Sequence, residues 1–218
     1  MKKALIVWGG WDGHEPKQVA EIFRNALAER GFDVEVSNTL DAFLDEARLT
    51  SLDLIIPEWT MGAIKREQLR PLLAAVQSGV GIAGVHGGMG DSFRQECDYQ
   101  WMVGGQWVAH PGGDTVTYDV QIVDKKHPVT KGLKDFKVTS EQYYMHVDPS
   151  NHALATTTFE PSDILAVPCV MPVAWTRRYG RGRVFYSSLG HVAKTAAQPE
   201  VLKLVTQGFL WASEKDSK

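Results

Sequence analysis

Cysteine is scarce in this sequence. Only Cys97 and Cys169 occur among 218 residues, and they lie far apart in the chain. Two thiols can build neither a disulfide framework nor a four-thiolate zinc site. We therefore expect both thiols to be free and buried.

An excess of positive charge is also missing. Lys and Arg number 23 against 26 for Asp and Glu, which gives a formal net charge of -3. Nucleic-acid-binding domains usually carry a basic excess, so this balance argues against a nucleic-acid partner. The densest basic patch, within residues 177–183, is interpreted as a solvated strand edge.

No apolar run is long enough to cross a bilayer. The longest, residues 164–175, is interrupted by Pro168 and Pro172 and is shorter than the roughly 20 residues that a spanning helix needs. The apolar residues 4–8 near the N-terminus are too few for the hydrophobic region of a secretion signal. These features predict no membrane partner and a cytoplasmic location.

The first half of the sequence alternates apolar runs with helical periodicity. Strands are predicted at residues 3–8, 33–36, 52–57 and 80–85, and helices at 15–30, 40–47 and 67–78. Such alternation is typical of an α/β fold, with a parallel sheet covered on both faces.

The second half is rich in strands separated by turn residues. Strands are predicted at residues 115–123, 136–144, 153–159, 173–178 and 183–188, followed by a closing helix at 198–211. Their spacing favours an antiparallel arrangement attached to the parallel sheet. With no linker or repeat, we expect one domain over residues 1–213 and a short tail at 214–218.

Parallel sheets bind ligands at the carboxyl ends of their strands. Trp11 and His14 follow the first predicted strand, Glu58 and Trp59 follow the third, and His86 follows the fourth. We therefore expect His14, Glu58 and His86 to converge on one cleft.

The segment Gly84-Val85-His86-Gly87-Gly88 is a strand that leads into a tight glycine turn, which is the arrangement of a nucleophile elbow. We expect His86 at an exposed tip, where its imidazole can act as a base, an acid or a metal ligand. The alternative is a turn histidine that only bonds backbone groups.

Five histidines follow predicted strands or lie in glycine- and proline-rich loops: His14, His86, His110, His146 and His191. None forms a helical pair of the metalloprotease type, so a zinc site would need ligands from separate loops. His86, His110 and His191 are the candidate ligands, and the structural alternative for each is a surface or capping role. No nucleotide cofactor is expected.

Acidic and aromatic residues complete the candidate site. Glu141 and Tyr143 lie where the chain leaves a predicted strand, and a carboxylate beside tyrosines suits the wall of a sugar site. Trp107 falls in another strand-end loop and offers a flat face to a sugar ring, although core packing is the alternative for all these aromatics. Two further acids, Glu15 and Asp91, are candidate partners of the histidines, and the alternative is that they support or cap the helices that follow them.

The same segments resemble the trehalose-utilisation, or ThuA-like, family. The resemblance covers nearly the whole chain and rests on the motif around His86, on Val103-Gly104-Gly105 leading to His110-Pro111, on residues 124–128 and 141–144, and on the blocks 172–175 and 182–191. It implies a flavodoxin-like, class I glutamine amidotransferase-like fold and a role in sugar use. Amidotransferases need a cysteine at the elbow, and His86 stands there, so glutamine hydrolysis through a thioester is excluded.

We therefore expect an enzyme, an isomerase or a hydrolase, that acts on a sugar or keto-sugar by acid/base chemistry. His86, Glu141 and His191 would be catalytic, and a zinc ion that polarises the carbonyl is a variant. The residues expected to bind the sugar are Trp11, His14, Glu58, Trp59, Trp107 and Tyr143. The alternative is a sugar-binding or regulatory domain without catalysis, and a homo-oligomer is compatible with either.

Overall fold

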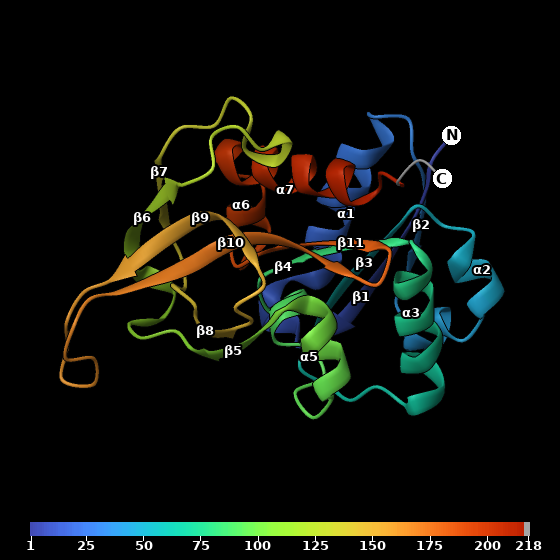
Figure 1. The fold of residues 1–218 in the computed structure, drawn as a ribbon, viewed down its shortest axis with the longest axis horizontal. Coiled ribbons are helices and arrows are strands. Elements are labelled where there is room, and N and C mark those ends of the chain that lie inside the picture. The colour runs from blue at the N-terminus through green and yellow to red at the C-terminus, as the bar shows by residue number, and fades with distance from the viewer. Residues whose placement is uncertain (216–218) are drawn as a thin grey trace.

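The computed structural model describes residues 1–215, and its centre is a nine-stranded sheet in the order β2-β1-β3-β4-β11-β10-β9-β6-β7 (Figure 1). The strands are β1 (Lys3–Gly10), β2 (Asp33–Ser37), β3 (Leu54–Thr60), β4 (Gly81–Val85), β6 (Thr117–Ile122), β7 (Phe136–Thr139), β9 (His152–Phe159), β10 (Cys169–Tyr179) and β11 (Gly182–Ser187). A separate two-stranded sheet pairs β5 (Gly105–Ala109) with β8 (Tyr144–Val147). The α/β class predicted from the sequence is confirmed.

Helices cover both faces of the large sheet (Figure 1). One face carries α1 (Pro16–Ala28), α6 (Ala193–Ala196) and α7 (Pro199–Ala212), and the other carries α2 (Glu46–Thr50), α3 (Arg66–Ser78) and α5 (Cys97–Val103). The apolar stripes of α1 and α3 fit this role, because residues such as Phe23 and Leu72 are fully buried against the sheet. Two apolar cores result, one on each side of the sheet.

The second half contributes a strand to the parallel part of the sheet, which the sequence did not predict. β11 runs parallel to β4 and antiparallel to β10. The strands β10, β9, β6 and β7 then continue in antiparallel pairs, as expected. β11 is therefore the seam at which the two halves of the chain join.

Three local predictions were wrong. The helix predicted at 40–47 is a 3-10 turn, η2 (Leu40–Phe43), followed by α2. The strand predicted at 136–144 breaks into β7 and β8, because residues 140–143 turn inward to bury Ser140, Glu141 and Gln142. Asp91 caps no helix at residue 92; its carboxylate instead forms a two-pronged ion pair with Arg94.

The two cysteines are free, as predicted, but they are not buried. Cys97 is exposed on the first turn of α5, and Cys169 is half-buried where β10 begins. Each is the first residue of its element rather than part of its buried interior.

The ends of the described chain lie side by side (Figure 1). The Lys2 ammonium is 2.7 Å from a carboxylate oxygen of Glu214, just beyond the end of α7. Of the tail predicted at 214–218, residues 216–218 lie outside the described part of the structure. Within residues 1–215, no helix combines the length and the apolar character that a bilayer crossing requires.

Candidate active site

His14 reaches the site from the connection after β1. It ends the 3-10 turn η1 (Asp12–His14), and its side chain is buried. Its Nδ1 lies 2.8 Å from the hydroxyl oxygen of Thr60, the last residue of β3. Two neighbouring parallel strands thus fix the ring so that Nε2 faces the cluster described below.

His86 stands at the sharp turn between β4 and α4 (His86–Gly90), with a φ of 44°. That left-handed backbone and the glycines after it give the predicted elbow. The prediction of an exposed tip was wrong, because His86 is only 1% exposed. Its ring stacks on Tyr143 with centroids 3.9 Å apart, and Nδ1 lies 2.7 Å from the carbonyl oxygen of Ser188.

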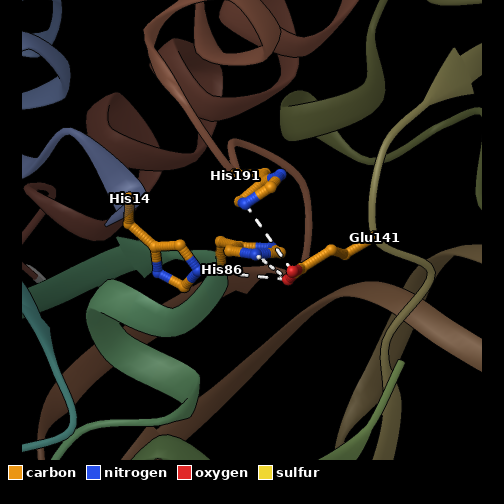
Figure 2. Close-up of side chains that lie close together, drawn as sticks. All are labelled: His14, His86, Glu141 and His191. Carbon is orange, nitrogen blue, oxygen red and sulfur yellow. Dashed lines mark hydrogen bonds and ion pairs between the residues drawn. The ribbon is translucent and has the colours of Figure 1, made fainter. Parts of the chain in front are cut away.

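Glu141 is the centre on which the histidines converge (Figure 2). It lies in the inward turn between β7 and β8, and its Oε2 is 3.0 Å from His86 Nε2. The Nε2 atoms of His191, His110 and His14 lie 3.6, 3.7 and 3.9 Å from its oxygens. Four imidazoles from four separate connections therefore surround one carboxylate.

Burial sets the charges in this cluster. It lowers the pKa of His14 to about 3, with a further contribution from the neighbouring His86 and His191. The pKa of His191 is lowered for the same reasons. Burial alone would raise the pKa of Glu141, but the hydrogen bond from His86 and the nearby imidazoles lower it to about 2. At neutral pH the cluster holds an ionised carboxylate beside neutral His14 and His191.

The two contacts of the His86 ring indicate whether the cluster can bind a cation. The Ser188 carbonyl can only accept, so Nδ1 carries a proton and donates it. Nε2 then faces the Glu141 carboxylate, another acceptor, at 3.0 Å. Such a contact is favourable only with a positive charge between the two atoms. A second proton on His86 or a bound cation would supply it.

Four residues have the donor set of a metal site. His14, His86, Glu141 and His191 each offer one ligand atom, and these atoms all lie within 4.8 Å of one another. Neutral imidazoles and one carboxylate are donors that zinc prefers. Two of these rings are also held in place from behind, since the Thr60 hydroxyl lies beside Nδ1 of His14 and the Ser188 carbonyl beside Nδ1 of His86.

His110 lies at the rim of the cluster. Its side chain is 36% exposed, and its Nε2 is 3.7 Å from Glu141 Oε1. His146, which shared its sequence pattern, points elsewhere: it is exposed on β8 and joins no contact with the cluster among the described residues. The alternation of side chains along β8 turns Met145 inward and His146 outward.

Glu58 is not one of the four residues whose ligand atoms converge among the described residues. It is 2% exposed and lies under the elbow, where any Cβ at Gly88 would collide with its carboxylate. Its Oε2 is buried and has no hydrogen-bond partner among the described residues. His14 and His86 meet as predicted, with ring centroids 4.8 Å apart, whereas Glu58 lies beneath the turn rather than in contact with them.

The predicted aromatic residues lie around the cluster. Trp11 is 48% exposed and meets His14 edge to face, with centroids 4.8 Å apart. Trp107 is half-buried beside His110 and Tyr143, at 5.5 and 6.1 Å. Trp59 instead packs over Gly9 and Gly62.

Two supporting groups escaped the sequence reasoning. Thr60 and the Ser188 carbonyl orient the imidazoles, and a carbonyl carries no residue-type signal. Glu15, considered as a partner of the histidines or as support for its own helix, instead accepts a hydrogen bond through Oε2 from the backbone N–H of Ala193, 3.0 Å away, at the start of α6. It therefore ties the segment that holds His191 to the one that holds His14.

Comparisons with known proteins agree with this architecture. The model of the ThuA family, described as trehalose utilisation, matches residues 3–212. A ThuA-like protein from Parabacteroides merdae ATCC 43184 is 20% identical, with a TM-score of 0.75 over 100% of this chain and 92% of its own. A ThuA-like protein from Bacteroides uniformis ATCC 8492 is 17% identical, with a TM-score of 0.78 over 97% and 91%.

A third similar structure is a cytoplasmic protein from Salmonella typhimurium LT2. It is 11% identical, with a TM-score of 0.68 over 97% of both chains. These likenesses confirm the flavodoxin-like, amidotransferase-like fold. No curated protein matched the sequence. The cytoplasmic location of this chain stays a prediction.

Proposed function

Because this chain belongs to the ThuA, or trehalose utilisation, family, we propose that it is an enzyme of carbohydrate metabolism that acts on a sugar or keto-sugar. The observation that carries the proposal is the convergence of four imidazole Nε2 atoms on the buried carboxylate of Glu141. Burying so many titratable groups together lowers the stability of the fold. Such an arrangement is typical of functional sites and is not needed to form a turn.

The chemistry is proton transfer next to a carbonyl, as in isomerisation or in elimination from a keto-glycoside. One group must remove a proton and another must stabilise the charge that develops on the carbonyl oxygen. Glu141 is ionised and positioned to direct a neighbouring imidazole, which takes up the proton. His110, the most accessible imidazole of the cluster, is placed to exchange protons with substrate.

A divalent cation, zinc by donor type, completes this proposal. His14, His86, His191 and Glu141 would hold it, and it would polarise the carbonyl of the substrate. It would also supply the positive charge that the contact between His86 Nε2 and Glu141 requires. Trp11 and Trp107 would then flank the sugar ring.

The first prediction tests the cluster. His86→Asn should lower the rate of proton exchange on a keto form of trehalose at least about 100-fold, because Asn has no ring nitrogen that takes up a proton or binds a cation. Proton NMR in D₂O measures this exchange directly. Asn tolerates a positive φ better than most residues, so the variant should keep the fold.

The matched control is His146→Asn, which removes an exposed histidine outside the cluster. It should change the rate less than twofold. The metal is tested in parallel: chelation should inactivate the protein, and zinc measured by elemental analysis should fall in Glu141→Gln and His86→Asn but not in His146→Asn. A folded His86→Asn protein with wild-type exchange would overturn the enzyme proposal, and a sugar-binding domain without turnover would replace it.

A further inference from the structure

A polar groove adjoins the cluster on the side of His191. It has a volume of about 630 Å³, within the usual range of small-molecule sites. Its walls come from η3 (Gly113–Thr115), the end of β7 and the start of α6. The residues that matter here are Asp114, Thr115, Thr139, His191, Lys194 and Gln198.

His191 belongs to both places. It lines the groove, and its Nε2 lies 3.6 Å from Glu141 in the cluster. His86 and Glu141 themselves are 1% and 7% exposed, so little space surrounds them. A substrate that places one reacting group at the cluster must extend its remaining part along an adjoining surface, and this groove is such a surface.

The chemistry of the groove selects for a hydroxylated and uncharged ligand. Threonine hydroxyls and the Gln198 amide can each donate and accept hydrogen bonds, as vicinal sugar hydroxyls do. Lys137 is neutralised by Asp119, at 2.8 Å. Lys194 and Asp114 then contribute one charge of each sign, so the groove has no net charge to attract a phosphate or a carboxylate.

Lys194 is the clearest recognition residue. It is exposed on α6, and within residues 1–215 its ammonium has no hydrogen bond or ion pair. Asp114 lies close enough to His191 to influence its charge. Among residues 1–215, no aromatic side chain other than His191 lines the groove, so it offers no platform for an aryl group.

We infer that this groove binds the second, non-reacting ring of a neutral glycoside while the first ring lies at the histidine cluster, and that Lys194 and Asp114 determine specificity for that second ring. The inference rests on the proposed function, because it takes the cluster to be the place of reaction. It adds the location and the recognition chemistry of the second ring. It also predicts discrimination against phosphorylated and aryl-substituted sugars.

The test compares ligands that differ only in the second group. Binding of trehalose, methyl α-glucoside, trehalose 6-phosphate and 4-nitrophenyl α-glucoside is measured by calorimetry on the full chain. Trehalose should bind at least about tenfold more tightly than the other three. Lys194→Ala should weaken trehalose binding about tenfold, the loss of one hydrogen bond to a charged group, and methyl α-glucoside binding less than twofold.

Asp114→Asn should show the same pattern, and Lys125→Ala is the control, since that exposed lysine lies outside the groove. The inference would be overturned if Lys194→Ala weakened the binding of trehalose and of methyl α-glucoside by the same factor. It would also be overturned if the wild-type protein bound the two ligands with equal affinity. The proposed function fails by a different readout. The proposed function is contradicted if the keto form of trehalose undergoes no proton exchange, whereas trehalose binding in the groove needs no turnover.

Discussion

A single buried acid shows how tightly the elbow is built. Glu58 lies under the turn at Gly88, and burial raises the pKa of its carboxyl well above the ordinary value. The close packing leaves no room for a side chain at position 88, which explains the glycine there. The carboxyl of Glu58 therefore keeps its proton to a higher pH than an exposed glutamate does.

The raised pKa of Glu58 makes the stability of the folded protein depend on pH. In the unfolded chain Glu58 ionises above its ordinary pKa, near pH 4.5, while the folded protein keeps the proton. The free energy of unfolding therefore falls as pH rises from about 4.5 toward the raised folded pKa, by up to about 1.4 kcal/mol per pH unit.

Glu58→Gln should remove this dependence, because an amide does not ionise in either state. We expect the variant to match the wild type near pH 4 and to exceed its stability increasingly at pH 6 and 8, measured by urea denaturation. Glu67→Gln, on the exposed first turn of α3, is the control and should leave the curve unchanged. Parallel pH curves for the wild type and Glu58→Gln would contradict the buried, protonated assignment.

At the scale of elements, the connections after the strands matter more than the strands themselves. Glu15 begins α1 yet accepts a hydrogen bond from Ala193, the first residue of α6. His14 precedes it directly, and His191 lies two residues before Ala193. One carboxylate thus fixes the separation of two cluster histidines that are 177 residues apart in the chain, from 14 to 191.

Glu15→Ala should loosen this tie and misplace His191. We expect kcat to fall about tenfold, since small displacements of catalytic groups are costly, while the melting temperature changes by only a few degrees. Glu15→Gln keeps an acceptor oxygen and should recover most of the activity. Because a general loss of stability would not be rescued this way, histidine NMR shifts of both variants distinguish positioning from unfolding: the His191 signals should move in Glu15→Ala alone.

Regular elements followed from local sequence patterns. The periodicity of apolar residues predicted α1, α3 and α7, and alternation predicted β6, where Tyr118, Val120 and Ile122 are buried. These patterns work because one face of each element must bury apolar surface. The break between β7 and β8 had no such signal, since Glu141 and Gln142 turn inward for polar partners that lie far away in the chain.

The site followed only in part from the sequence. The rule that ligands bind at the carboxyl ends of parallel strands brought His14 and His86 together correctly. It could not separate His110 from His146, because His146 lies on the outward side of β8 while His110 follows β5 at the rim of the cluster. Nor could it foresee a buried elbow, which results from Tyr143 stacking over the ring from the other half of the chain.

At the scale of the whole molecule, the two halves share one sheet. β11 pairs with β4 in parallel, and α7 packs under both strands and fills the core beside Phe185. The cluster depends on the same seam, since His86 follows β4 and His191 follows β11. A single domain over residues 1–213 stays a prediction, and this arrangement makes it testable.

We expect the chain to unfold in one cooperative step. Tryptophan fluorescence reports on both halves, since Trp59 lies in the first and Trp175 in the second. Urea transitions followed by fluorescence and by far-ultraviolet circular dichroism should therefore coincide. A fragment of residues 1–112 should not fold alone, because it would expose the hydrogen-bonding edge of β4 and lose the cover that α7 gives that face. Adding residues 113–218 as a separate peptide should restore circular dichroism and the His86–Glu141 contact only if β11 inserts beside β4. Two separate transitions, or a folded fragment 1–112, would show that the halves are independent domains.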